Sequence, residues 1–286
     1  MNQRETWQVG AARVTPLNAG DLRLRLAEEM AVPEEVWRPR YADLFEAVSA
    51  CPSLSALVEL GEMRLLVDAN DYRATVTPGS EYAIADYTPP PDIPTQLAAL
   101  GVSTGDITHV VITHAHWDHF AGLTTPTADG VALTYPNARH YFGGADWRAD
   151  ETQAALADPT SLEARTLGAV HAAGALTLVD AREELAEGVA ILPAPGETPG
   201  HQLVRVASGG QTLYIIGDLL HHPIEVEYPD WMVTWAEPAS MRESRRWWLA
   251  DALAERALVV AAHFALPGHI EQADDGGMRW APVTAG

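Results

Sequence analysis

Residues 110–123 read VVITHAHWDHFAGL, an apolar run that leads directly into three histidines and an aspartate. The surrounding segment ITHVVIT (107–113) is rich in β-branched residues and predicts a short buried strand. His114 and His116 follow where that strand should stop, and in an extended chain residues two apart project to the same side, so both imidazoles can bind one ion. Asp118 and His119 come in the next turn and must point elsewhere, which suits a second ion nearby.

Three further candidate ligands lie at the ends of other predicted strands. His201 enters a strand in ETPGHQL (197–203), Asp218 closes LYIIGD (213–218), and His263 closes LVVAAHF (258–264). A carboxylate that follows four apolar residues needs a partner, because an unpaired buried charge is costly. Imidazole nitrogen and carboxylate oxygen are ligands that zinc accepts readily. We therefore expect strands that form a platform and strand ends that hold metal ions.

The composition narrows the functional class. The chain has 286 residues, 47% of them hydrophobic, which is enough for a substantial core. Its 39 acidic and 18 basic residues, all of the latter arginine, give a net charge of −21, so nucleic acid and anionic membrane are poor partners. The single cysteine, Cys51, excludes an internal disulfide framework, and no apolar run is long enough to span a bilayer. We expect a cytoplasmic location, because the N-terminal residues lack the pattern of a secretory signal.

The remaining elements predict a layered α/β sandwich in a single domain. Residues 6–18 should form an opening strand, residues 21–30 fit either a strand or a helix, and residues 55–70 should form a hairpin that turns at Gly61. Further strands are expected within 138–143, 175–180, 189–195, 201–208, 212–218 and 257–264. Helices are expected within 93–101, 147–158, 161–174 and 241–256.

The motif HAHWDH (114–119) resembles the metallo-β-lactamase-fold superfamily, whose pattern His-x-His-x-Asp-His it matches at every fixed position. The resemblance extends from Asp68 to His263 and implies a four-layer αββα sandwich, with residues 1–286 as one domain and residues 1–50 as an N-terminal extension of strand and helix. It implies two divalent metal ions, zinc first, with manganese, iron or cobalt as alternatives. The implied first-ion ligands are His114, His116 and His201. The implied second-ion ligands are Asp118, His119 and His263. Asp218 would bridge both ions, and Asp68 would brace the histidine loop through hydrogen bonds.

The implied activity is hydrolysis by a hydroxide that bridges the two ions, with Asp118 also acting in catalysis as an orienting group or proton relay. The segments GDLLHHPIEVEYPDW (217–231) and VVAAHFALPGHI (259–270) resemble the branch of methyl parathion hydrolase and its arylesterase- and lactonase-like relatives. This branch implies action on carboxylic esters or lactones, with side activity toward organophosphate triesters.

Several alternatives stay open. Acyl-homoserine-lactone lactonases tend to carry a tyrosine three positions after the bridging aspartate, where this chain has His221. A β-lactamase usually presents a basic group to its substrate's carboxylate, a task that an arginine would have to perform here. A metal-binding protein without activity is disfavoured, because structural zinc sites are usually closed and rich in cysteine.

Aromatic residues close to the candidate ligands favour a small, uncharged, apolar or aromatic substrate. Trp117 lies inside the metal motif, Phe264 follows His263, and Trp231 and Trp235 follow Asp218. We expect Trp117, His221, Phe264 and Trp231 to line the substrate pocket. Residues 34–48, EEVWRPRYADLFEAV, should either roof this pocket or form a homodimer contact.

Overall fold

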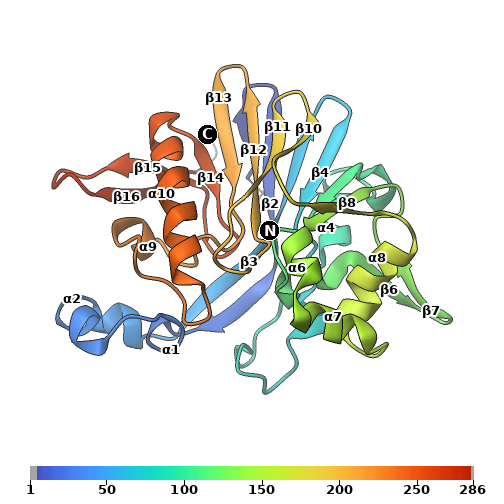
Figure 1. Ribbon diagram of the computed structural model, residues 1–286, viewed down its shortest axis with the longest axis horizontal. Coiled ribbons are helices and arrows are strands. Elements are labelled where there is room, and N and C mark those ends of the chain that lie inside the picture. The colour runs from blue at the N-terminus through green and yellow to red at the C-terminus, as the bar shows by residue number, and fades with distance from the viewer. Residues whose placement is uncertain (1–4, 285–286) are drawn as a thin grey trace.

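Two seven-stranded sheets lie face to face in the computed structural model, which describes residues 5–284 (Figure 1). The first sheet has the strand order β1-β2-β3-β4-β5-β8-β9, and the second runs from β10 to β16 in chain order. Strands β6 and β7 form a separate two-stranded sheet.

The strands are β1 (Trp7–Val9), β2 (Ala12–Leu24), β3 (Ser49–Leu60), β4 (Met63–Val67), β5 (His109–Val111), β6 (Thr124–Thr127), β7 (Gly130–Leu133), β8 (Arg139–Gly143), β9 (Leu176–Val179), β10 (Glu183–Ala186), β11 (Val189–Pro193), β12 (Gln202–Ser208), β13 (Gln211–Ile215), β14 (Leu258–Val260), β15 (Gly268–Gln272) and β16 (Met278–Pro282). The α-helices are α1 (Leu26–Glu29), α2 (Glu34–Glu46), α3 (Tyr72–Thr75), α4 (Ile93–Ala99), α5 (Trp117–Phe120), α6 (Gly144–Arg148), α7 (Asp150–Ala157), α8 (Ala169–Ala172), α9 (Ile224–Glu227) and α10 (Pro238–Ala254). Short 3-10 turns at Thr104–Asp106 and Ala121–Leu123 and a π-helical turn at Ala164–Gly168 complete the set.

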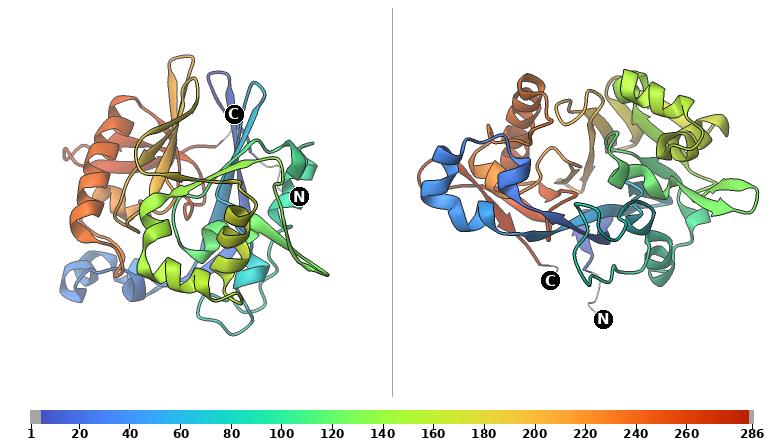
Figure 2. Two further views of the ribbon diagram at one scale, coloured as in Figure 1. Left: turned by 45° about the vertical axis from the view of Figure 1, so that its right-hand side comes forward. Right: turned by 90° about the horizontal axis from the view of Figure 1, so that it is seen from below.

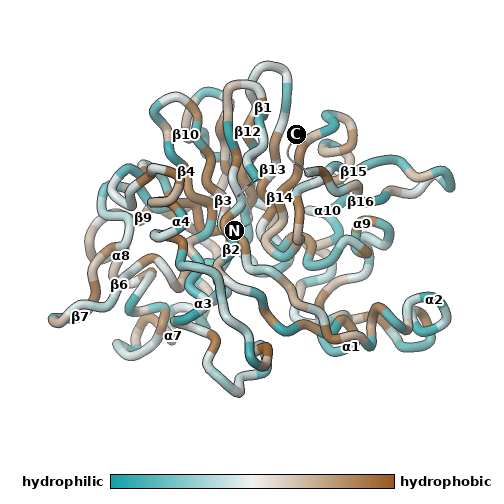
Figure 3. Tube along the Cα trace, turned by 180° about the vertical axis from the view of Figure 1, so that it is seen from behind, coloured by the Kyte–Doolittle hydropathy of each residue, from teal (hydrophilic) through white to brown (hydrophobic). Residues whose placement is uncertain are grey.

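Three apolar cores separate four layers. Between the sheets, Val58 and Val67 of the first sheet belong to one buried cluster with Val204 and Ile215 of the second. A second cluster joins the outer face of the first sheet to helices that include α4 and α8, and a third joins the second sheet to α10. Apolar residues gather along the strands of the facing sheets in Figure 3, as burial on two faces requires. The predicted αββα sandwich is confirmed.

The strand pattern brings several loops to one edge of the sandwich. Strand β4 pairs in parallel with β5, and β13 pairs in parallel with β14. Parallel neighbours have their carboxyl ends at the same edge of a sheet, and these four ends carry Asp68, His114, Asp218 and His263 shortly after the strands finish. The turn between β11 and β12 adds His201 to the same edge.

The N-terminal segment departs from the expected single strand. Residues 7–24 form a hairpin, β1–β2, and β2 pairs with β3 through most of its length, so this part is an edge of the first sheet. The hairpin turns at Gly10, which has φ +58°, and a Cβ there would lie 2.1 Å from the Ser208 carbonyl oxygen. Residues 21–30, for which strand and helix were the two predicted alternatives, contain both: strand β2 continues to Leu24, and helix α1 follows. The C-terminal hairpin β15–β16 was not predicted.

Helices α1 and α2 form an arm that projects from the body at the lower left (Figure 1; Figure 2, left). The arm is tied to the chain after Asp218 by a β-bridge between Met30 and Val233 and by a 2.7 Å hydrogen bond between the Tyr41 and Tyr228 hydroxyls. Glu29, in the arm, also lines the cavity described below. Part of the arm therefore reaches the pocket, while the homodimer contact stays a prediction. Within residues 5–284, no helix combines the length and apolarity needed to cross a bilayer.

Candidate metal centre

The histidine loop is fixed by a buried carboxylate. Asp68 follows β4 in the left-handed region, at φ +61°, and it is 2% exposed. Its Oδ1 accepts a 2.8 Å hydrogen bond from the Thr113 backbone N–H, and its Oδ2 accepts one of 3.0 Å from the Thr113 hydroxyl. Oδ2 also lies 2.8 Å from His119 Nδ1, so a proton on that nitrogen leaves the Nε2 lone pair free. This is the contact by which an outer carboxylate orients a metal-binding imidazole.

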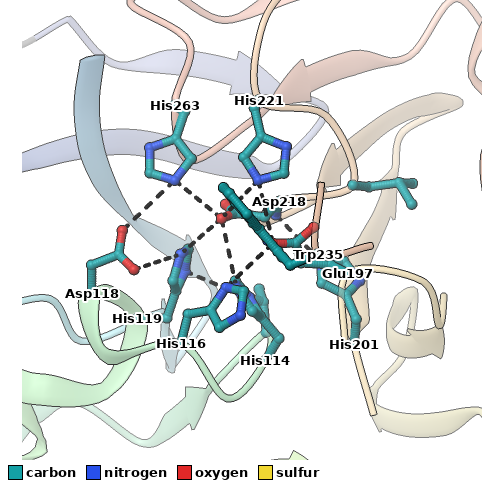
Figure 4. Close-up of polar contacts among 12 residues, drawn as sticks. His114, His116, Asp118, His119, Glu197, His201, Asp218, His221, Trp235 and His263 are labelled. Atoms are coloured by element: carbon teal, nitrogen blue, oxygen red, sulfur yellow. Dashed lines mark hydrogen bonds and ion pairs between the residues drawn. The ribbon is translucent and has the colours of Figure 1, made fainter. Parts of the chain in front are cut away.

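One group of potential ligands contains His114, His116, Glu197 and Asp218, whose candidate ligand atoms all lie within 4.8 Å of one another. His114 Nε2 lies 2.9 Å from His116 Nδ1 and 3.6 Å from Asp218 Oδ2. His116 Nδ1 in turn lies 3.3 Å from Glu197 Oε1. Figure 4 shows these side chains pointing toward one another.

A second group contains Asp118, His119 and His263. His119 Nε2 and His263 Nε2 lie 3.6 Å and 3.7 Å from the two oxygens of Asp118. Asp218 Oδ2 reaches this group as well, at 3.3 Å from His119 Nε2 and 3.1 Å from His263 Nε2. A single carboxylate thus lies against both groups, as a bridging ligand would.

His201 lies beside the first group, although it is not one of its four members. Its ring centroid is 5.3 Å from that of His114, and the side chain is fully buried. Nδ1 lies 3.0 Å from the Ala194 carbonyl oxygen, to which it can donate, while Nε2 accepts a 3.3 Å hydrogen bond from the Asp218 backbone N–H. With Nδ1 protonated, the Nε2 lone pair is engaged by the Asp218 backbone N–H, so binding an ion through this nitrogen would replace that hydrogen bond.

The buried polar atoms fit a metal centre. His119 Nε2, Asp218 Oδ1, Glu197 Oε2 and His221 Nε2 are all inaccessible to solvent and have no hydrogen-bond partner among the described residues. Buried polar atoms are nearly always satisfied, so four orphans at one place call for a bound group. Nitrogen and carboxylate oxygen donors are those that zinc, manganese and iron accept.

The electrostatics agree with this interpretation. Burial favours neutral Asp218, but the neighbouring His263, His119 and His114 hold the pKa of its carboxyl well below the usual range. Burial by itself would lower the pKa of the His221 imidazole, but the Glu197 and Asp218 carboxylates raise this pKa to about 10. The carboxylates therefore attract positive charge to this site, and divalent cations can supply it.

A cavity of about 180 Å³ opens on the metal-binding groups. Apolar and aromatic side chains form much of the cavity wall. Of the residues predicted to line the pocket, Trp117 and His221 border this cavity. The lining residues are Leu22, Arg23, Leu24, Glu29, Cys51, Tyr82, His116, Trp117, Asp118, Asp218, His221, Trp235 and His263.

Two predicted pocket residues do not line this cavity. Phe264 is 2% exposed and packs edge-on against Trp280, with 4.9 Å between ring centroids, because the chain turns its side chain into the core behind the site. Trp231 stacks on Tyr228 at 4.2 Å and belongs to the contact with the arm. Trp235, four residues further along the same loop, takes the place by the site, where its ring lies 6.3 Å from that of His116.

Glu197 is the site residue that the sequence analysis missed. It lies in the quoted segment ETPGHQL, but a charged residue in a proline- and glycine-rich turn is usually exposed. Here its side chain is fully buried. Its Oε1 accepts a 2.5 Å hydrogen bond from Trp235 Nε1 and lies 3.4 Å from His221 Nε2. The signal available in the sequence was its position four residues before His201.

Residues 49–269 match the family described as the metallo-beta-lactamase superfamily. The chain belongs to this superfamily. No curated protein sequence matches the chain significantly.

Solved structures of similar fold cover nearly the whole metallo-β-lactamase-fold chain. A hydrolase of the beta lactamase superfamily, AbOPH, has 20% identity and a TM-score of 0.79, with 99% of this chain and 98% of that chain covered. The dizinc quorum-quenching lactonase AidC, solved with the product N-hexanoyl-L-homoserine, has 21% identity, a TM-score of 0.76 and coverage of 98% and 97%. A probable metal-dependent hydrolase from Staphylococcus aureus has 20% identity, a TM-score of 0.76 and coverage of 97% and 99%. At these identities the likeness concerns the fold, and the particular branch of methyl parathion hydrolase remains a prediction.

We expect Asp68→Asn to lower the affinity of the apoprotein for zinc about 10- to 100-fold, the usual effect of losing an outer partner of a metal-binding histidine. The amide would present an N–H group or a weaker acceptor to His119 Nδ1, so the ring would lose its fixed tautomer. Competition with a chromophoric chelator measures the change. Asp92→Asn, which alters the cap of α4 far from the site, serves as the matched control. Equal zinc affinities for the two variants would contradict the bracing role.

Proposed function

We propose that the protein is a dinuclear metal-dependent hydrolase of carboxylic esters or lactones, with side activity toward organophosphate triesters. The observation that carries the proposal is the position of Asp218, whose Oδ2 lies against ligands of both groups at the floor of a small, largely apolar cavity. The family and the fold of AidC support a hydrolytic centre of this kind.

We assign the ligands as the family resemblance implies. His114, His116 and His201 would hold the first ion, Asp118, His119 and His263 the second, and Asp218 both. Two divalent ions, zinc in the first instance, would polarise the substrate carbonyl and lower the pKa of a bound water toward ~7. No serine or cysteine nucleophile is needed.

The protein's own groups would bind and orient the substrate. Trp117, Tyr82 and Trp235 form aromatic walls against which an apolar acyl or aryl group can pack. Asp118 is 8% exposed and borders the cavity, so its carboxylate can hold the proton lost by water and pass it to the leaving oxygen. His221, stacked on His263 with 5.7 Å between ring centroids, borders the cavity at the position where acyl-homoserine-lactone lactonases tend to carry a tyrosine.

The charges around the cavity favour an uncharged substrate. Arg23 and Glu29 both line it, so neither sign prevails outside the metal-binding groups. A volume of about 180 Å³ is below the ~300–1,000 Å³ of pockets for drug-sized ligands, which favours a small ester or lactone. Nucleic acid and a membrane surface remain poor partners in this proposal, and the cytoplasmic location remains a prediction.

A substrate panel tests the proposal. The protein, stripped of metal and reloaded with zinc, is assayed on an aryl ester, a dihydrocoumarin-type lactone, an acyl-homoserine lactone, a β-lactam and a phosphotriester. We expect the highest kcat/KM on the aryl ester or the dihydrocoumarin-type lactone, weaker turnover of the phosphotriester, and loss of all activity on chelation. The highest kcat/KM on the acyl-homoserine lactone would favour the quorum-quenching alternative, and bound metal without turnover of any member would overturn the hydrolase.

A further inference from the structure

The buried carboxylate of Glu197 is not explained by the ligand set that the family resemblance implies. It follows β11 in the turn that leads to His201, and its side chain is fully buried. Oε1 is engaged by the Trp235 indole N–H and lies near two imidazoles, whereas Oε2 has no hydrogen-bond partner among residues 5–284. A buried carboxylate oxygen without a partner is costly, so this one requires a donor or a cation.

The position of Glu197 satisfies the geometry of a metal ligand. Its carboxylate and the ligand atoms of His114, His116 and Asp218 lie within 4.8 Å of one another. Two atoms bound to one ion at ~2.0–2.2 Å can be at most ~4.4 Å apart, so only small side-chain adjustments are needed. The Trp235 N–H donates to Oε1, the oxygen that also lies 3.3 Å from His116 Nδ1, and so fixes the carboxylate, as outer hydrogen bonds do for ligating carboxylates.

We propose that Glu197 is a direct ligand of the first metal ion, and that it shifts the preference of this site toward a hard cation such as Mn²⁺. This inference rests on the proposed dinuclear centre. With Glu197, three carboxylates instead of two face the pair of ions, and the first site gains an oxygen donor beside its imidazoles. Oxygen donors suit manganese, while nitrogen-rich sites suit zinc.

The test measures metal binding, which is a separate readout from catalysis. Apoprotein is titrated with Mn²⁺ and with Zn²⁺, and the Co²⁺-loaded protein is examined by its visible absorption. We expect Glu197→Gln to reduce the Mn²⁺ affinity at least tenfold more than the Zn²⁺ affinity, because a neutral amide oxygen is a weaker ligand for a hard ion. The Co²⁺ absorption should intensify as the coordination number falls. Glu271→Gln, which removes a partly exposed carboxylate of β15 outside the cavity and both ligand groups, should leave both measurements unchanged.

Two outcomes would count against the inference in different ways. If the unmodified protein binds no metal, the dinuclear centre itself fails and Glu197 with it. If the unmodified protein binds two ions but Glu197→Gln lowers both affinities equally with an unchanged Co²⁺ spectrum, Glu197 only positions His116 and the inference is overturned. Glu197→Asp provides a second variant, checked by circular dichroism: it keeps the charge but withdraws the carboxylate by one methylene, so an altered Co²⁺ spectrum supports direct ligation and an unaltered one contradicts it.

Discussion

Asp218→Ala is expected to lose both metal ions and almost all hydrolytic activity. The Asp218 Oδ2 atom lies 3.6 Å from His114 Nε2, 3.3 Å from His119 Nε2 and 3.1 Å from His263 Nε2, so its removal affects both ligand groups at once. Metal ions contribute several kcal/mol of transition-state stabilisation, and each ~1.4 kcal/mol is a factor of ten in rate. We therefore expect kcat/KM to fall by a factor on the order of 10³ or more.

Metal content by mass spectrometry and kcat/KM on the best panel substrate measure this effect together. The matched control is His171→Gln, which removes an exposed histidine of α8 that packs on Trp147 away from the cavity. The control should keep two metal ions and unchanged kinetics. Two bound ions and full activity in Asp218→Ala would refute the assignment of the bridging ligand.

Arg245→Leu is expected to destabilise the apoprotein by about 3–5 kcal/mol, the typical cost of breaking a buried ion pair from one side. Arg245 and Glu225 are both fully buried and lie 2.6 Å apart. Arg245 also donates to the carbonyl oxygens of Leu219 and Pro229, at 2.7 Å and 3.1 Å. Glu225 accepts hydrogen bonds from the backbone N–H groups of His221 and His222, so the pair supports the whole loop after Asp218.

Urea unfolding of metal-free protein measures the change, since bound metal would add its own stabilisation. Arg242→Leu is the matched control. Arg242 is on the same helix and contacts Asp230 of the same loop, but both side chains are largely exposed, at 54% and 79%. Exposed pairs contribute at most ~1 kcal/mol, so the control should change stability little. Similar losses for the two variants would show that burial of the pair is unimportant.

Local patterns predicted a large part of this protein. Of the ligands that the family resemblance implies, His114, His116 and Asp218 fall into one group and Asp118, His119 and His263 into the other. The β-branched run before His114 forms β5, and the hairpin at Gly61 forms β3 and β4. These features depend on periodicity, turn residues and spacing between near neighbours, which the chain carries in short segments. The N-terminal hairpin could not be predicted from local patterns, because its turn at Gly10 packs against Ser208, almost two hundred residues away in the chain.

The sequence by itself determined the layered fold, the strand-end platform and the residue types suited to metal ions. Only the tertiary structure decided which side chains share the site. Trp231 and Trp235 lie four residues apart in one loop, but packing of the N-terminal arm against Trp231 leaves Trp235 to border the cavity. The local sequence predicts that Glu197 is a solvent-exposed turn residue, but in the folded protein its side chain is buried beside His116 and His221. Burial and side-chain direction are set by contacts between distant segments, which no local pattern encodes.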